Sequence, residues 1–200
     1  MTPADRAVLH AALRRVEPLT DGELQVFDDV ARLVPLARGR TFLAAGDRAV
    51  DCGTVLEGVL REYYPLEDGR EVTRNFAGPG DGVGSLSDLI SGEPARSSVA
   101  AETDARLVIV PWRVVRDSAA RIPAWSRFLA RTVERLYLAK AAREYELLAL
   151  DAEARYACFR TRFAELEAHI ALRQVASYLG ITPEHLSRLR RRLADRARAG

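Results

Sequence analysis

The residues with the clearest chemical role lie near the C-terminus, in the stretch from Leu172 to Leu193. Glu184, Ser187 and Arg188 are spaced to share one face of a helix, and Arg191 follows about one turn later. An arginine can donate two hydrogen bonds to guanine O6 and N7, a glutamate can accept one from cytosine N4, and a serine can bind a base edge or a phosphate. The pattern therefore predicts a surface that reads DNA bases in a major groove.

Other polar residues around this face are candidates for phosphate contacts, which position a protein on DNA without reading its sequence. They are Thr182, His185, Arg173, Arg190 and Arg192. The last thirty residues hold seven arginines and two acidic residues, whereas the whole chain has a net charge of only +2. A basic end on a slightly acidic body is typical of a protein that meets a polyanion. Arginine abundance alone proves nothing, because the chain has a single lysine and is rich in arginine throughout.

The same stretch has the pattern of a helix-turn-helix. Gly180 supplies a sharp turn between two short apolar repeats, and Thr182 and Pro183 suit the first positions of the second helix. The residues expected inside are Val175, Ala176, Leu179, Ile181, Leu186, Leu189 and Leu193. The alternative is a helical hairpin whose charged face is merely solvated.

A long helix is expected from Ile122 to Leu150, because this segment has no glycine and its only proline, Pro123, lies where a first turn tolerates one. At 1.5 Å per residue it would be about 40 Å long, more than a domain of this size can cover. Its apolar stripe, interrupted by Lys140 and Arg143, consists of Leu129, Val133, Leu136, Leu147, Leu148 and Leu150. A second copy of the helix is the expected partner, giving a homodimer. Packing against the rest of the same chain is the alternative.

Short β-prone runs separated by glycines fill residues 40–110, as in an antiparallel barrel or roll. Asp68 and Gly69 suit a hairpin turn between two of them. Ahead of the roll, Pro3–Arg15 and Thr20–Leu33 are expected as helices. The predicted fold class is α+β, with helices and a β-roll in residues 1–121, a dimerisation helix in 122–150 and a helix-turn-helix unit in 151–200.

Composition limits the function further. Hydrophobic residues make up 48% of the chain, enough for a buried core, and no run is long enough to span a membrane or act as a secretory signal. We expect a cytoplasmic protein with no membrane partner. The two cysteines are too far apart in sequence for a closely spaced metal cluster. Metal-ligand spacings, a paired nucleophile and base, and a P-loop are all missing from the sequence, so we expect neither a metal site nor an enzyme.

These regions, in this order, resemble the Crp/Fnr family of bacterial transcription regulators, in which a cyclic-nucleotide-binding β-roll precedes a dimerisation helix and a helix-turn-helix. The likeness covers nearly the whole chain. The segments that carry it are Leu56–Gly58, Gly69, Pro79–Asp81 with Gly84, Ala101–Asp104, Pro123 and Leu150–Arg155. Glu184, Ser187 and Arg188 are similar to the signature with which Fnr-type members read a TGA-containing half-site. The resemblance implies a homodimer on palindromic DNA, with half-sites about one helical turn apart, and RNA polymerase as a further partner.

The effector pocket departs from the family pattern. Where cyclic-AMP binders have Gly-Glu, this chain has Gly84, Ser85 and Leu86, so the carboxylate for the ribose is missing. Arg96 and Ser97 are candidates to hold a phosphate, although Arg96 comes one place late. Lys140 stands where adenine would be read. We expect a degenerate pocket. The alternative is a pocket that binds a cyclic nucleotide or another small anion.

Two further departures concern cofactors and the C-terminus. The cysteine cluster of iron-sulfur oxygen sensors and an obvious haem ligand are both missing, and His10 and His169 suit surface or packing roles. Only seven residues follow Leu193, so a full wing is not expected. The competing function is a cyclic-nucleotide sensor that acts through protein contacts rather than DNA.

Overall fold

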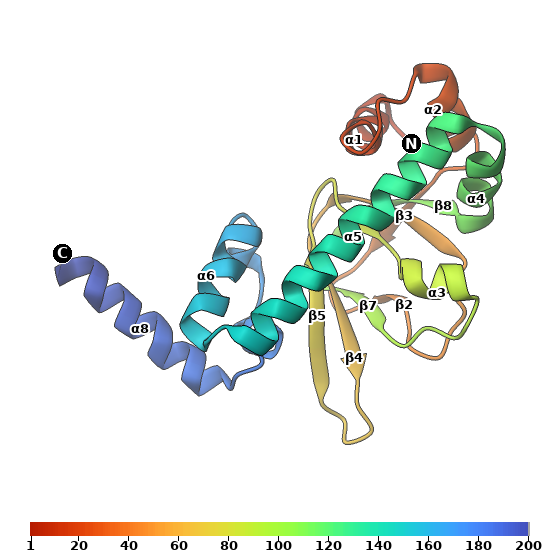
Figure 1. Ribbon diagram of the computed structural model, residues 1–200. Coiled ribbons are helices and arrows are strands. Elements are labelled where there is room, and N and C mark those ends of the chain that lie inside the picture. The colour runs from red at the N-terminus through yellow and green to blue at the C-terminus, as the bar shows by residue number, and fades with distance from the viewer. Residues whose placement is uncertain (200) are drawn as a thin grey trace.

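A β-roll built from two antiparallel sheets forms the N-terminal part of the computed structural model, which describes residues 1–199 (Figure 1). One sheet has the order β1-β8-β3-β6 and the other the order β2-β7-β4-β5. The strands are β1 (Arg32–Leu36), β2 (Thr41–Leu43), β3 (Asp51–Glu57), β4 (Leu60–Pro65), β5 (Glu71–Ala77), β6 (Gly82–Val83), β7 (Ser98–Ala101) and β8 (Ala105–Pro111). The predicted α+β fold with an N-terminal roll is confirmed.

An apolar core lies between the two sheets. Its buried members alternate along the strands with residues on the other side of each sheet, where Val108 and Val110 are also buried, in a second cluster with Leu9 and Leu24. They include Leu43, Val55, Leu60, Val83, Val99, Ala101, Leu107 and Ile109. Gly53 on β3 packs so closely against β8 that a Cβ there would lie 2.0 Å from the Val108 carbonyl oxygen. The two sheets are thus held in one compact roll.

Helices α1 (Pro3–Arg14) and α2 (Asp21–Asp28) precede the roll. Each opens with a threonine capping box, Thr2 with Asp5 and Thr20 with Glu23. The prediction of one helix from Thr20 to Leu33 was wrong at its end, because α2 stops at Asp28 and Arg32 already belongs to β1. The sequence pattern also gave no sign of two short helices, α3 (Leu86–Ser91) and α4 (Trp112–Arg121).

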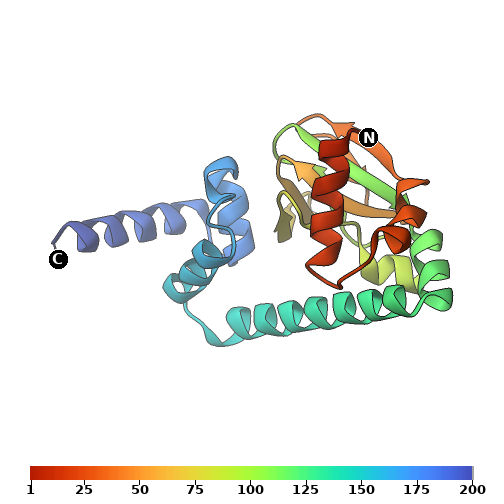
Figure 2. The ribbon, with the colours of Figure 1, turned by 90° about the horizontal axis from the view of Figure 1, so that it is seen from above.

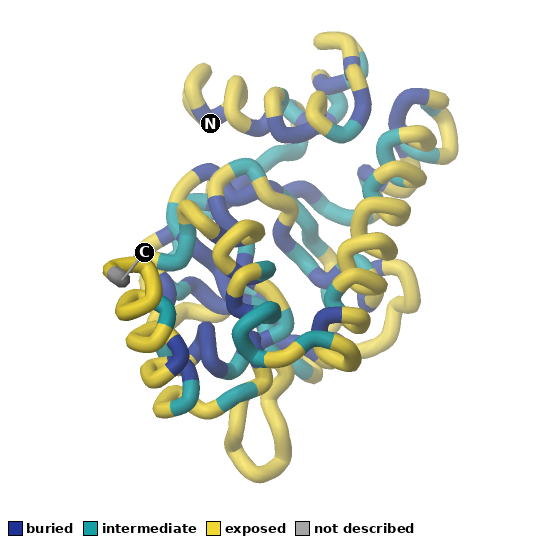
Figure 3. The backbone as a smooth tube through the Cα atoms, turned by 60° about the vertical axis from the view of Figure 1, so that its left-hand side comes forward, coloured by how far each residue is buried: buried dark blue, intermediate teal, exposed yellow. Residues whose placement is uncertain are grey.

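The long helix α5 (Pro123–Ala149) links the roll to the C-terminal helices, and Figure 2 shows it running past the roll before the chain turns back. Its first turns are anchored by Trp125, which stacks on Phe27 at 4.0 Å between ring centroids and donates a hydrogen bond to the Glu23 carbonyl. Most of the rest of the helix is exposed (Figure 3). Exposed apolar side chains on it are Val133, Leu136, Tyr137, Leu138, Tyr145, Leu147 and Leu148.

Four C-terminal elements complete the chain: α6 (Ala152–Arg162), the short 3-10 helix η1 (Glu167–His169), α7 (Leu172–Leu179) and α8 (Pro183–Ala199). They share one core, in which Phe159, Phe163 and Tyr178 surround Phe76 from β5 of the roll. The C-terminal unit is therefore docked on the roll. The predicted lack of a wing concerns residues after α8 and stays a prediction.

Ser177 of α7 forms hydrogen bonds with the edge strand of the roll. β5 is the last strand of its sheet, so one side of its backbone has no strand partner. The Ser177 hydroxyl accepts a hydrogen bond from the Thr73 amide at 2.9 Å and donates one to the Glu71 carbonyl at 3.0 Å. The hydroxyl thus satisfies one backbone amide and one backbone carbonyl of β5 that a neighbouring strand would otherwise bind.

Candidate nucleic-acid interface

The helix pair α7 and α8 is fixed by buried apolar contacts and by a tight turn. Ala176 is fully buried where the helices approach each other, and Gly180 takes a φ of +68°, which favours glycine. Thr182 then caps α8, because its hydroxyl accepts a hydrogen bond from the His185 amide at 3.2 Å. Leu186 and Leu189 are fully buried. One side of α8 therefore faces the core and the opposite side faces solvent.

The solvent side of α8 carries the residues whose spacing predicts base reading. Glu184, Ser187, Arg188 and Arg191 are all exposed, so the structure does bring them onto one free face. The pKa of Glu184 is lowered, first by a hydrogen bond from its own backbone amide and then by one from the Thr182 hydroxyl. The carboxylate is therefore ionised at neutral pH and can act only as a hydrogen-bond acceptor.

One of the arginines predicted to contact phosphates, Arg192, lies near an acidic residue of α6, as does Arg196. Arg196 Nη1 lies 2.7 Å from Glu153 Oε1, and Arg192 Nη2 lies 3.9 Å from Glu153 Oε2. Glu153 therefore holds two guanidinium groups on one flank of α8. Arg190 extends along the other flank, in a cavity of about 300 Å³ between α6 and α8.

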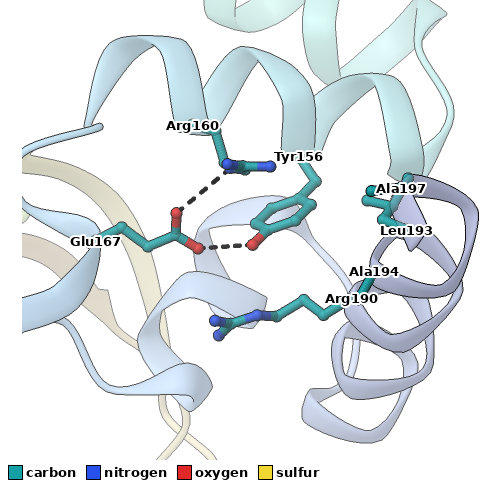
Figure 4. Close-up of a pocket in the computed structure, with 7 residues that line it drawn as sticks. All are labelled: Tyr156, Arg160, Glu167, Arg190, Leu193, Ala194 and Ala197. Atoms are coloured by element: carbon teal, nitrogen blue, oxygen red, sulfur yellow. Dashed lines mark hydrogen bonds and ion pairs between the residues drawn. The ribbon is translucent and has the colours of Figure 1, made fainter. Parts of the chain in front are cut away.

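Figure 4 shows this cavity, with Arg190 reaching from α8 toward Tyr156 and Glu167. The Tyr156 hydroxyl donates a hydrogen bond to Glu167 Oε1 at 2.6 Å. Burial, and then this bond, raise the pKa of Tyr156 to about 12, so the hydroxyl keeps its proton at neutral pH. Arg160 lies 3.7 Å from the other oxygen of Glu167. Ion pairs therefore join α8 to α6 on the Glu153 flank, while on this flank Arg190 lines a cavity beside the Tyr156–Glu167 hydrogen bond.

The remaining predicted contacts lie at the ends of the two helices. Thr182 is exposed and His185 is half-buried at the start of α8. Arg173 is exposed in the first turn of α7, and its Nε donates to Gln174 Oε1 at 3.2 Å. These three side chains lie at the N-terminal ends of α7 and α8, where backbone amides also favour anions.

A polar network joins the end of α5 to this unit. The carboxylate of Glu146, which is buried, pairs with Arg143 on its own helix at 3.0 Å and with Arg162 of α6 at 2.5 Å. Arg143 also lies over the ring of Tyr178 at 3.8 Å. Sequence reasoning missed these residues, together with Glu153 and Ser177. Only the interruption of the apolar stripe at Arg143 hinted at a polar contact there.

The six residues predicted for an effector are spread over different environments. Gly84 has a φ of +119° at the end of β6, Ser85 is buried within 3.3 Å of the Ser87 hydroxyl, and Leu86 begins α3. Ser97 is buried inside the roll and donates a hydrogen bond to Glu62 at 2.7 Å. Arg96 and Lys140 are exposed, and within residues 1–199 neither side chain makes an ion pair or hydrogen bond. Of the two predicted phosphate ligands, Ser97 is thus bonded inside the roll and Arg96 is not.

The part of the chain that the structure describes holds neither a cluster of metal ligands nor a membrane-spanning helix. Within residues 1–199, three or more histidine, cysteine or acidic side chains nowhere gather in a way that could hold a metal ion. Over the same range, every helix is too short or too polar to cross a membrane.

Comparison with known proteins places this geometry in context. Residues 33–121 match the model of the cyclic nucleotide-binding domain. The fumarate and nitrate reduction regulatory protein of Escherichia coli strain K12 is 27% identical over 187 residues, which cover 86% of this chain and 72% of that protein. The chain is therefore similar to this regulatory protein over most of its length and contains a match to the cyclic nucleotide-binding domain.

Solved structures show the same fold across most of the chain. FixK2 from Bradyrhizobium japonicum aligns with a TM-score of 0.74 and 24% identity, covering 84% of this chain and 86% of its own. The c-di-GMP responsive global regulator CLP of Xanthomonas campestris aligns with a TM-score of 0.70 and 16% identity, covering 89% of this chain and 93% of its own. The chain thus shares the fold of these solved proteins over most of its length.

Proposed function

We propose that this chain is a DNA-binding transcription regulator of the Crp/Fnr type. Two copies of it bind one palindromic DNA site, each placing α8 in a major groove. The observation that carries this proposal is the free face of α8, where Glu184, Ser187, Arg188 and Arg191 are exposed while Leu186 and Leu189 fix the helix from behind. Glu184 accepts from a cytosine, Arg188 donates to a guanine, and Ser187 contacts a base edge or a phosphate. The protein acts in the cytoplasm, with RNA polymerase as a further partner.

The second copy pairs through α5. Leu136 and Leu147 are 41% and 45% exposed on a helix whose fold already buries the apolar residues near its start, Ala124 and Trp125. Leu129, Val133 and Leu136 follow one another at spacings of four and three, and Leu147 lies on the same face three turns later, beyond Lys140 and Arg143. Such a stripe is typical of a two-stranded coiled coil. A two-fold axis along this stripe relates the two α8 helices, which is why the DNA site is palindromic.

Phosphate contacts in this proposal come chiefly from groups that have no acidic partner on the protein. Arg191 lies next to the reading face, and Arg173, Thr182 and His185 lie at the N-terminal ends of α7 and α8. Arg192 serves mainly to hold α8 on α6, because it lies near Glu153, whereas Arg190, which lines the cavity between the two helices, is a further phosphate contact. The three functional regions are residues 1–121, 122–150 and 151–200.

The effector pocket of the roll is degenerate, and DNA binding needs no cyclic AMP. Arg96 and Lys140, which would meet the phosphate and base of a nucleotide, are exposed and separate from the buried Ser97. The carboxylate for a ribose hydroxyl is replaced by Ser85. A charge-assisted bond of that kind contributes about 1.5 to 3 kcal/mol, so its loss alone weakens binding tenfold or more.

The test is a selection of bound duplexes from a random library, with wild-type protein, Arg188→Ala and the control Arg116→Ala. Arg116 is exposed on α4 and pairs only with its neighbour Asp117. Wild type and the control should enrich one two-fold motif with half-sites about 10 base pairs apart between centres. Arg188→Ala should lose preference at one guanine per half-site, a cost of about 1 to 3 kcal/mol. Equal motifs and affinities for wild type and Arg188→Ala would show that α8 does not read bases.

A further inference from the structure

A buried polar cluster inside the roll is used by none of the contacts described for DNA. Ser97, which is 1% exposed, donates a hydrogen bond to Glu62 Oε1 at 2.7 Å. The Arg74 guanidinium donates to the same oxygen. The side chains of Glu62 and Arg74 are 17% and 23% exposed, so the pair is largely removed from solvent. Side chains from β4, from β5 and from the residue just before β7 thus meet at one oxygen of Glu62.

The register of the sheet shows that this cluster faces the interior of the roll. Glu62 pairs with Val99 of β7, and Leu60, two residues earlier, pairs with Ala101. Leu60, Val99 and Ala101 all belong to the apolar core between the sheets. Because residues two apart share a face of a strand, Glu62 points to the same side as these three. The β4–β5 pairing is irregular at Glu62, which lets Arg74 reach its carboxylate.

A serine hydroxyl and a guanidinium that converge on one point form a cradle for an oxyanion, since both donate hydrogen bonds and one carries a positive charge. Here the chain fills that cradle with its own carboxylate. We propose that Glu62 is a built-in ligand of the roll, which excludes anionic effectors and fixes β4, β5 and β7 in the arrangement that an effector would otherwise stabilise. This inference rests on the proposed function, in which DNA binding needs no cyclic nucleotide.

The strand that carries Arg74 is also the strand on which the DNA-binding unit docks. Thr73, the preceding residue, donates its amide to Ser177 of α7 at 2.9 Å. Phe76, two residues later, packs against Phe163 and Tyr178 with ring centroids 5.6 and 5.9 Å apart. Ion pairing inside the roll therefore stabilises the same stretch of β5, from Glu71 to Phe76, that contacts α7 and α6. An empty cradle would loosen this docking surface and lower DNA affinity.

The experiment is chemical rescue of the full-length Glu62→Ala variant with acetate, whose carboxylate matches the one removed. We expect the variant to melt several degrees below wild type and to bind the selected duplex about tenfold more weakly. Acetate should restore about half of each loss, whereas chloride at equal ionic strength should restore neither. Glu57→Ala, which removes the exposed partner of Arg106 in the same roll, is the matched control and should show no acetate effect.

Two further measurements decide the assignment. The double variant Glu62→Ala, Arg74→Met should lose the acetate response, because the guanidinium that holds the anion is gone. Calorimetry of wild-type protein with cyclic AMP, cyclic GMP and inorganic phosphate should give no binding. Micromolar binding of any of these by wild type, or a Glu62→Ala variant that acetate does not stabilise, would overturn the proposal. If wild type fails to bind DNA, the proposed function fails, while melting temperatures still report on the cradle.

Discussion

Arg191 and Arg192 are adjacent in sequence, yet the structure gives them different tasks, and this contrast can be measured. Arg191 is exposed and makes no ion pair with another side chain of the described range, whereas Arg192 shares Glu153 with Arg196. Arg191→Ala should therefore remove a phosphate contact, and Arg192→Ala should leave DNA binding nearly unchanged. The two variants are matched, because each removes one arginine from the same turn of α8.

The size of the effect follows from the release of counterions. Each neutralised phosphate adds about 0.9 to the slope of log K against log salt, and a dimer loses two contacts, so the slope of Arg191→Ala should fall by about 1.8. Between 50 and 200 mM salt, wild-type affinity should then drop about tenfold more than the affinity of Arg191→Ala. Conversely, Glu153→Gln should steepen the slope, because it frees Arg192 and Arg196 to meet phosphates.

The assay is fluorescence anisotropy of a labelled duplex that carries the selected site, titrated at five or more salt concentrations. Thermal unfolding of each variant serves as a check that the helices remain folded. The reasoning would be refuted if Arg192→Ala flattened the salt dependence as much as Arg191→Ala. A Glu153→Gln variant with an unchanged slope would count against the role given to Glu153.

Three other outcomes are expected. Phe76→Ala should lower the free energy of unfolding, measured in urea, by about 3 to 5 kcal/mol, because the Phe76 residue is 2% exposed and lies among aromatic side chains. A loss below about 1 kcal/mol would contradict the packing of the C-terminal helices on Phe76. Leu136→Glu should convert the dimer to a monomer in sedimentation velocity, whereas Leu138→Glu, on the other side of α5, should not. Burial, with a smaller effect of Asp51, raises the pKa of Cys52 to about 12. In a Cys158→Ser variant, iodoacetamide at pH 8 should therefore alkylate Cys52 of native protein about a thousandfold more slowly than Cys52 of unfolded protein. The rate for native protein should rise about tenfold per pH unit up to pH 12. Equal rates for native and unfolded protein would refute the burial of Cys52.

The helix-turn-helix could be predicted in detail because its determinants are local. Gly180 is needed for a positive φ, Thr182 for the cap, and the leucines of α8 recur at helical spacing, so a short window of sequence contains the whole pattern. The long helix and the glycine-punctuated roll were predicted for the same reason. The end of α2 was missed because the short segment from Val30 to Leu33 suits a helix as well as a strand, and only the pairing of Arg32 and Leu33 with β8 decides between them.

Contacts between distant segments could not be predicted from spacing. Glu153 meets Arg196 across 43 positions, and Ser177 meets Glu71 across 106. Their residue types are common on any helix surface, so nothing in the sequence separates them from solvated side chains. For this reason the sequence assigns Arg192 to DNA phosphates, whereas the structure shows Glu153 beside it. Ser97 was selected from its resemblance to a phosphate ligand, and its actual partner, Glu62, lies 35 positions away.

The position of β5 at the end of its sheet bears on how this protein can be divided. A fragment that stops at the end of α5 would lose Ser177 and the aromatic side chains over Phe76. It would then present an open row of amide and carbonyl groups beside an uncovered apolar ring, which is the kind of adhesive edge through which sheets polymerise. The isolated roll should therefore aggregate, and in the whole chain the DNA-binding helices also serve to keep it soluble.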